Sequence, residues 1–78
     1  MKISVKYFGV IAEKIGFSSE EIEIEVSEKL DLRAFFNQKH PEIKEITYKI
    51  AINQEITDFL ELTENQIEVA LLPPFAGG

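Results

Sequence analysis

The sequence predicts one small α+β domain, with a mixed sheet of about four to five strands, one main helix across it and a short extra helix. Three observations predict this class. Segments in which apolar and polar residues alternate, as in half-buried strands, lie near both ends of the chain. Two segments with apolar residues at helical spacing lie between strand-like segments. The 78 residues suffice for one modest core.

The first strand-like segment covers residues 2–8, and it is followed by the short helix. Its inward positions are Ile3, Val5 and Tyr7. Gly9 interrupts the alternation, and apolar residues at helical spacing then predict a helix over residues 10–15. Gly16 stands where such a helix would end.

The second strand is predicted over residues 21–26, where three apolar residues alternate with three glutamates. The apolar positions are Ile22, Ile24 and Val26, and the acidic positions are Glu21, Glu23 and Glu25. The glutamates could form an acidic docking face, but a solvated strand face is the favoured interpretation. We expect this strand to pair antiparallel with the first one as a hairpin.

The main helix is predicted over residues 31–39, with an apolar stripe that would pack across a sheet. The stripe consists of Leu32, Phe35 and Phe36. Ser27 or Asp31 could cap its start, and the sequence leaves both open. His40 precedes Pro41 and ends the helix. This single histidine could be a catalytic base, but a favourable position at the negative end of the helix dipole is the preferred interpretation.

The remaining strands lie in the second half of the chain. Tyr48, Ile50 and Ile52 alternate as a third strand, Asn53-Gln54 forms a turn, and Glu55 to Thr57 returns as a short strand. An irregular linking segment is expected around Leu60 and Leu62, as it is at residues 28–30. The last strand has Ile67, Val69 and Leu71 on one face. This order of elements is typical of a β-grasp fold, whose first and last strands lie parallel at the sheet centre.

Composition excludes several classes of function. The chain carries 14 acidic and 8 basic side chains, for a net charge of −6, and it has no cysteine. Binding to nucleic acid relies on cations placed against phosphates, so a basic protein surface is a better partner. Without cysteine, disulfides, thiolate metal sites and a cysteine nucleophile are excluded. No signal peptide or membrane helix is visible, and we expect a cytoplasmic protein.

The last residues are expected to form an extended, flexible tail, residues 73–78, beyond a domain of residues 1–72. None of the last ten side chains is charged. Pro73 and Pro74 have no backbone donor, so they cannot continue a central strand, and they favour a stiff arm. Phe75 would be an exposed aromatic on this arm, suited to a partner's pocket.

The ending Ala76-Gly77-Gly78 is almost without side chains, so it can thread a narrow channel. It would bring the carboxylate of Gly78 to an enclosed active site. A carboxylate is a poor electrophile, and another enzyme would have to activate it, for instance as an acyl-adenylate. Sulfur transfer to the adenylate would give a thiocarboxylate, a nucleophile that delivers sulfur without any cysteine.

With these residues in view, the chain resembles the small subunit of molybdopterin synthase, of the ubiquitin-like sulfur-carrier family. The segment 71–78, LLPPFAGG, carries the most specific part of the resemblance. Weaker matches are spread over the rest of the chain. They consist of Lys6 to Gly9 together with Glu13 and Gly16, then His40 to Glu42, and then Ala51 to Asn53. The chain departs from the family at Asn65-Gln66, where members often have Gly-Asp, and at the irregular residues 28–30.

The resemblance implies that Gly78 is adenylated by a ubiquitin-activating-type enzyme that uses ATP and magnesium, and that a sulfurtransferase then supplies sulfur. It implies insertion of the tail into the large synthase subunit, within a heterotetramer, where a pterin precursor accepts the sulfur. We expect Leu72, Pro73, Pro74 and Phe75 to contact partners, and Ala76 and Gly77 to thread the channel. The chain would bind no cofactor or metal, since it has no phosphate-binding glycine loop.

Three other functions remain open from the sequence. The thiamine-pathway sulfur carrier shares the fold and the chemistry, but its tail usually lacks the double proline. A ubiquitin-like modifier would attach to lysines through Gly78, and a binding module would not use the tail chemically. A free-standing enzyme is disfavoured because the sequence shows no nucleophile–base pair, so the catalytic pocket is expected on the large subunit.

Overall fold

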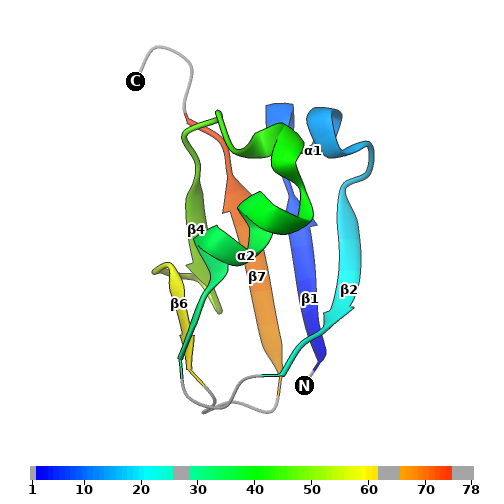
Figure 1. The fold of residues 1–78 in the computed structure, drawn as a ribbon. Coiled ribbons are helices and arrows are strands. Elements are labelled where there is room, and N and C mark those ends of the chain that lie inside the picture. The colour runs from blue at the N-terminus through cyan, green and yellow to red at the C-terminus, as the bar shows by residue number, and fades with distance from the viewer. Residues whose placement is uncertain (1, 26–28, 62–65, 75–78) are drawn as a thin grey trace.

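The computed structural model describes residues 2–25, 29–61 and 66–74, and it confirms an α+β fold (Figure 1). The elements are β1 (Lys2–Tyr7), α1 (Gly9–Ile15), β2 (Ser19–Glu23), β3 (Lys29–Asp31), α2 (Leu32–Lys39), a 3₁₀ turn (Pro41–Ile43), β4 (Lys49–Ile52), β5 (Glu55–Ile56), β6 (Phe59–Glu61) and β7 (Ile67–Leu72). The predicted strands and helices are all present, with boundaries that differ by a few residues.

Five strands form one mixed sheet in the order β2-β1-β7-β4-β5. β1 and β7 lie parallel at its centre, with Ile3 opposite Ile67 and Tyr7 opposite Leu71. β2 pairs antiparallel with β1, and β4 pairs antiparallel with β7. The β-grasp prediction, with its central parallel pair, is therefore confirmed. β1 and β2 are joined through α1 and not through a tight hairpin turn.

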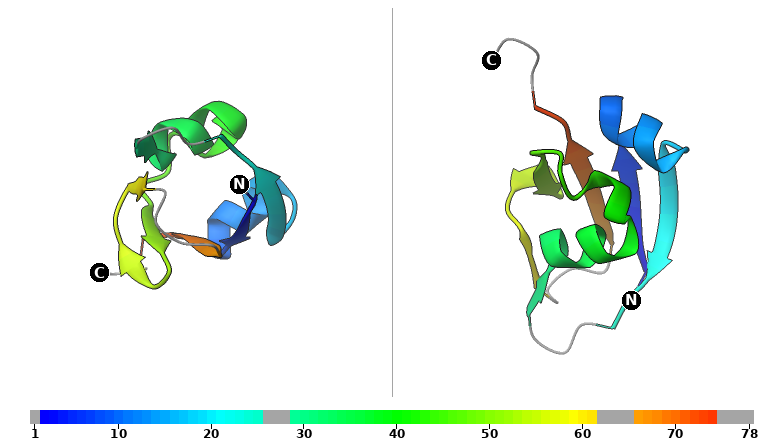
Figure 2. Two further views of the ribbon diagram at one scale, coloured as in Figure 1. Left: turned by 90° about the horizontal axis from the view of Figure 1, so that it is seen from below. Right: turned by 45° about the horizontal axis from the view of Figure 1, so that its top comes forward.

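α2 crosses one face of the sheet and covers the core (Figure 2). Leu32 and Phe36 are fully buried, whereas Phe35 is only partly buried at the edge of the core. The inward side chains of β1 and β7 meet this helix, because alternate residues of a strand face the same side. These side chains are Ile3, Val5, Tyr7, Ile67, Val69 and Leu71. Burial of this helix stripe and these strand faces drives the two layers together.

α2 is flanked at its start and its end by residues that the sequence predicted, Asp31 and His40. The side chain of Asp31 accepts a hydrogen bond from the Ala34 amide at 3.2 Å, so Asp31 is the N-cap. The other candidate cap, Ser27, lies outside the described residues. At the far end the His40 amide donates to the Phe36 carbonyl, and Pro41 begins the 3₁₀ turn. Proline cannot donate the next helical hydrogen bond, which explains why the α-helix ends there.

Two segments expected to be irregular instead form a second, two-stranded sheet. β3 and β6 pair antiparallel, with Leu30 opposite the buried Leu60. The prediction was wrong because each strand has only three residues, too few to show a period of two, and the partners are far apart in sequence. Leu62 lies outside the described residues.

The turn at Asn53-Gln54 joins β4 to β5, as predicted. Both residues have positive φ, 49° and 72°, as the tight two-residue turns of hairpins require. β5 ends at Ile56, one residue before the predicted end of the strand at Thr57. The Thr57 amide nevertheless donates to the Ile50 carbonyl at 3.0 Å and extends the contact with β4.

Arg33 on α2 joins the helix to the segment between β5 and β6. Its Nε and Nη2 donate to the two carboxylate oxygens of Asp58 at 2.8 and 2.9 Å. Its Nη1 donates to the Tyr48 carbonyl at 2.7 Å, and the guanidinium lies 4.7 Å from the centre of the Tyr48 ring. The Leu32 amide also donates to the Asp58 carbonyl. Planar, two-pronged pairing of this kind is a geometry that arginine provides and lysine does not.

The hydrogen bonds from Arg33 lower the pKa of the Asp58 carboxyl from its ordinary value of 3.8 and outweigh the opposite effect of burial. A depressed carboxyl pKa stabilises the fold fully above pH 3.8, and this stability is lost as pH falls through the folded-state pKa. Because both side chains are about one-third exposed, we expect Asp58→Asn to cost only about 1 kcal/mol at pH 7.

Urea unfolding of the two proteins from neutral pH downward measures this. The difference between wild type and Asp58→Asn should shrink below pH 3.8. In an Arg33→Met background, the same substitution should cost little at any pH. A difference that persists unchanged in strong acid would contradict the assignment to this ion pair.

Candidate functional site

The tail begins at the end of the central strand β7, at the same end of the sheet as α1 (Figure 1). Leu72 is the last residue of β7, and Pro73 does not continue it, as predicted. Pro73 is half-buried against the domain, and Pro74 is exposed. Phe75, Ala76, Gly77 and Gly78 lie outside the described residues, so their predicted roles stay predictions.

The outer face of the sheet, opposite α2, carries apolar side chains next to the base of the tail. Strand register places Ala70 of β7 beside Ala51 of β4, and Ala51 beside Ile56 of β5. One residue beyond the end of the β1–β7 pairing, Phe8 lies next to Leu72. We call these five residues the outer strip, and they are Phe8, Ala51, Ile56, Ala70 and Leu72.

The outer strip is an apolar surface on a chain that is otherwise strongly acidic, and all of its residues except the buried Ala51 are at least partly accessible. Phe8 is 43% exposed and Ile56 is 57% exposed, although both are large apolar side chains. Lys6 lies opposite Ala70, and Lys49 lies opposite Leu72, so the strip has two cationic neighbours. Contiguous exposed apolar residues with a polar rim mark an interaction surface more often than scattered ones do.

Sequence reasoning placed partner contacts on the tail and missed most of the strip. Its signal lies in β7, where the outward positions change from Glu68 to Ala70 and Leu72 toward the tail. The pairing of Ala51 with Ala70 could not be read from the sequence, because register between distant strands is set by the assembled sheet.

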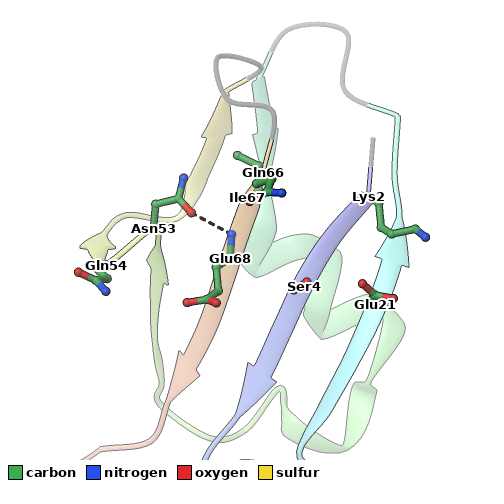
Figure 3. A pocket seen from close by; sticks show the side chains of 8 residues that line it. All are labelled: Lys2, Ser4, Glu21, Asn53, Gln54, Gln66, Ile67 and Glu68. Carbon is green, nitrogen blue, oxygen red and sulfur yellow. Dashed lines mark hydrogen bonds between the residues drawn. The ribbon is translucent and has the colours of Figure 1, made fainter.

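The opposite end of the same face is polar. An open hollow there is lined by Lys2, Ser4, Glu21, Asn53, Gln54, Gln66, Ile67 and Glu68 (Figure 3). The Asn53 side chain accepts from the Glu68 amide at 2.9 Å, so it closes the end of the β4–β7 pairing. The lining contains carboxylates, amides, a lysine and a serine, but it has no histidine to activate a nucleophile. The hollow therefore offers no evident catalytic centre.

The acidic residues of the second strand lie where the pattern predicted. Glu21, Glu23 and Glu25 are exposed, whereas Ile22 and Ile24 are buried. Val26 lies outside the described residues. Exposure is what the solvated-face interpretation requires, and nothing in the structure adds a reason for an acidic docking face.

His40 is held in a polar cluster with Tyr7 and Glu20. The Tyr7 hydroxyl donates to the Glu20 carboxylate, and His40 Nε2 lies 2.9 Å from the same oxygen. His40 Nδ1 lies 3.8 Å from a Glu42 carboxylate oxygen, and the ring packs edge-on against the Tyr7 ring. With its side chain only 12% exposed, His40 links the end of α2 to β1 and β2. This is a structural role that local sequence cannot reveal, and it disfavours a catalytic base.

The same cluster changes the acidity of its members. Burial alone would raise the pKa of the Glu20 carboxyl, but the hydrogen bonds from Tyr7 and His40 outweigh it and lower the pKa. Burial, together with the hydrogen bond to Glu20, raises the pKa of the Tyr7 hydroxyl well above its ordinary value. Glu20 is thus the ionised acceptor on which the other two groups converge.

Within residues 2–25, 29–61 and 66–74, no group of three or more acidic or histidine side chains is arranged to hold a metal ion. None of the helices in these ranges is long and apolar enough to cross a membrane. The described part of the chain therefore presents a surface and the base of a tail as its candidate functional features.

We predict that Glu20→Ala destabilises the protein by about 2 kcal/mol, because it leaves the buried donors Tyr7 and His40 without their shared acceptor. Glu21→Ala, at the neighbouring exposed position, should stay within about 0.5 kcal/mol of wild type. Chemical unfolding at neutral pH compares the two. Equal losses would show that the cluster contributes no specific stability.

Comparisons with known proteins point to one family. The ThiS family profile matches residues 5–78. No curated protein sequence matches the chain significantly. The family match covers the β-grasp elements and the tail alike.

Solved structures agree with this assignment. The putative molybdopterin converting factor subunit 1 of Pyrococcus furiosus is 26% identical, with a TM-score of 0.77 over 96% of this chain and 99% of that one. A chain in the complex of subunits 1 and 2 of the molybdopterin-converting factor of Helicobacter pylori is 26% identical, with a TM-score of 0.64 over the whole of both chains. The small archaeal modifier protein 1 (SAMP1) of Methanosarcina acetivorans is 26% identical, with a TM-score of 0.68 over 99% of this chain and 96% of that one.

These similarities confirm the resemblance to ubiquitin-like sulfur carriers and to the small subunit of molybdopterin synthase. They include modifier proteins as well, so they identify a family and not a single pathway. By its fold and by a profile match over nearly its whole length, the chain belongs to the ThiS family.

Proposed function

We propose that the chain is a sulfur carrier of molybdenum cofactor biosynthesis. Gly78 would be adenylated, converted to a thiocarboxylate, and inserted into the large subunit of molybdopterin synthase, where a pterin precursor accepts the sulfur. The observation that carries the proposal is the continuity of the outer strip with the tail at Leu72. One apolar surface leads across the sheet to Leu72, where the C-terminal segment begins.

In this proposal the outer strip binds the partner, and the tail carries the reacting group. Phe8 and its neighbours would dock the domain on a partner, since exposed aromatics supply much of the affinity of an interface. Docking would hold the base of the arm, residues 73–78, at the mouth of an active site. The near absence of side chains at Ala76 and Gly77 would then let the arm enter it.

The chemistry requires groups that other proteins supply. An activating enzyme, with ATP and magnesium, would let the Gly78 carboxylate displace pyrophosphate and form an acyl-adenylate. A sulfurtransferase system would then supply sulfur at the oxidation level of sulfide, which attacks the carbonyl carbon, displaces AMP and leaves the thiocarboxylate. This chain contributes the carboxyl carbon, and we expect it to bind no cofactor of its own.

The choice of pathway rests on similarity and on the tail. The Pyrococcus and Helicobacter structures are described as components of molybdopterin converting factor, and the latter as a complex of its two subunits. The chain's ending, with its double proline Pro73-Pro74, resembles the C-terminal signature of the same family. A thiamine-pathway carrier and a protein modifier, the latter favoured by the similarity to SAMP1, are the alternatives. Each would act in the cytoplasm, which the cysteine-free sequence fits.

Removing Gly78 should abolish thiocarboxylate formation and leave the thermal unfolding midpoint unchanged, since no core residue is touched. Intact-mass measurement on protein from the native host should show replacement of oxygen by sulfur at the C-terminus of the wild type only. A chain extended by one residue after Gly78 is the matched control and should fail in the same way. Gly-Gly remnants on lysines without any sulfur-bearing species would support a modifier instead.

Phe8→Ala should weaken binding to the large synthase subunit by about tenfold or more, because it removes the largest exposed side chain of the outer strip. Phe59→Ala is the control, because Phe59 is 47% exposed but belongs to the β3–β6 sheet. Calorimetric titration of both variants measures this. Equal affinities would rule out the strip as the docking surface.

Gene deletion separates the two sulfur pathways. Loss of molybdoenzyme activity, with thiamine-independent growth retained, is the expected outcome. Thiamine dependence with intact molybdoenzymes would assign the chain to the other pathway.

A further inference from the structure

Gly9 lies directly beside the first residue of the tail. β1 and β7 run parallel with Tyr7 opposite Leu71, so continuing the same register by two residues places Gly9 opposite Pro73. A Cβ atom added to Gly9 would lie 3.0 Å from Pro73 Cγ and 3.7 Å from Pro73 Cβ. The shorter distance is tighter than most contacts of Cβ atoms, so a side chain at position 9 would require the proline ring to shift by a few tenths of an ångström.

This contact lies just beyond the last paired residues of β1 and β7. Pro73 has no amide hydrogen, so it cannot donate to a neighbouring strand. It is nevertheless half-buried, whereas Pro74 is exposed. Among the described residues, Pro73 is thus the last one that rests on the domain, and it rests on the turn between β1 and α1.

Two constraints act at Gly9, its positive φ and its contact with Pro73. Gly16 allows their effects to be distinguished. Gly9 has φ +57° and Gly16 has φ +102°, so a side chain is strained at both positions. Nothing lies within 4 Å of a Cβ added at Gly16. The two sites therefore share the backbone constraint, but only Gly9 has the contact with the tail.

We propose that Gly9 is a positioning residue, which seats Pro73 and thereby sets the direction in which the C-terminal segment leaves the sheet. The consequence for sulfur transfer rests on the proposed function. The contact itself does not, because it is a property of the folded domain.

A side chain at Gly9 would have to push the Pro73 ring away. Any change of direction at residue 73 is carried through the stiff Pro73-Pro74 pair to the point where the last four residues begin. When a group must enter an enclosed site, a misplacement of about 1 Å can reduce the rate roughly a hundredfold, so a shift of a few tenths of an ångström is enough for a measurable loss. Gly9→Ala should therefore reduce reaction of Gly78 far more than it reduces binding through the outer strip.

The first experiment tests the contact in the free protein by NMR. Wild type should show nuclear Overhauser effects between Gly9 Hα and the Pro73 ring protons. Cα–Hα residual dipolar couplings at Pro73 and Pro74 should change in Gly9→Ala and remain unchanged in Gly16→Ala. Absence of the contact in wild type, or equal couplings in all three proteins, would overturn the proposal.

The second experiment measures adenylation by the activating enzyme of the same organism. Gly9→Ala should lower kcat/KM several-fold, mainly through kcat, whereas Gly16→Ala should leave it close to wild type despite similar backbone strain. In a Pro73→Ala background, which removes Cγ, the additional effect of Gly9→Ala should disappear. Equal losses in the two glycine variants, or an undiminished loss in the Pro73→Ala background, would overturn the proposal.

The proposal can still be tested if Gly9→Ala does not fold or if wild type is not adenylated. If Gly9→Ala does not fold, Gly9→Asn replaces it and Gly16→Asn becomes its control, because asparagine tolerates positive φ and still carries a Cβ atom. If wild type is not adenylated at all, the proposed function fails. The NMR result then decides on Gly9 alone.

Discussion

The parallel pairing of β1 with β7 is the interaction on which the rest of the structure depends. It joins the two ends of the sequence at the centre of the sheet, with Ile3 opposite Ile67 and Tyr7 opposite Leu71. Parallel strands need a long crossover, and here nearly the whole chain provides it. Because the pair is central, its inner face must be covered by a helix, which is the position that α2 occupies.

The same pair also determines where the candidate site lies. Its inner face is filled by fully buried side chains, and its outer face carries part of the outer strip. Continuing its register places Phe8 beside Leu72 and Gly9 beside Pro73. The position of the outer strip and the start of the C-terminal segment are therefore consequences of one strand pairing.

Polar groups hold the helix at its two ends. Arg33 joins the first turn of α2 to Asp58, and His40 joins its last turn to Glu20 and Tyr7. The cluster around His40 satisfies the hydroxyl of the buried Tyr7, and polar contacts contribute most to stability at such buried groups, whereas Arg33 and Asp58 are about one-third exposed. The two clusters hold the helix against one face of the sheet, whereas the outer strip lies on the other face.

Local patterns in the sequence were sufficient to predict the strands of the five-stranded sheet, both helices, the turn at Asn53-Gln54 and the end of the central strand before Pro73. Each of these depends on a period, a cap or a missing backbone donor within a few neighbouring residues. The β3–β6 sheet and the polar contacts of His40 were not predicted, because they depend on partners distant in sequence. The outer strip and the seat of Pro73 on Gly9 likewise arise only when strand register brings residues 8–9 and 72–73 together. The sequence predicted a role for the C-terminal residues, and the assembled sheet decided what lies beside the start of that segment at residues 72–73, since register is a property of paired strands and not of either strand alone.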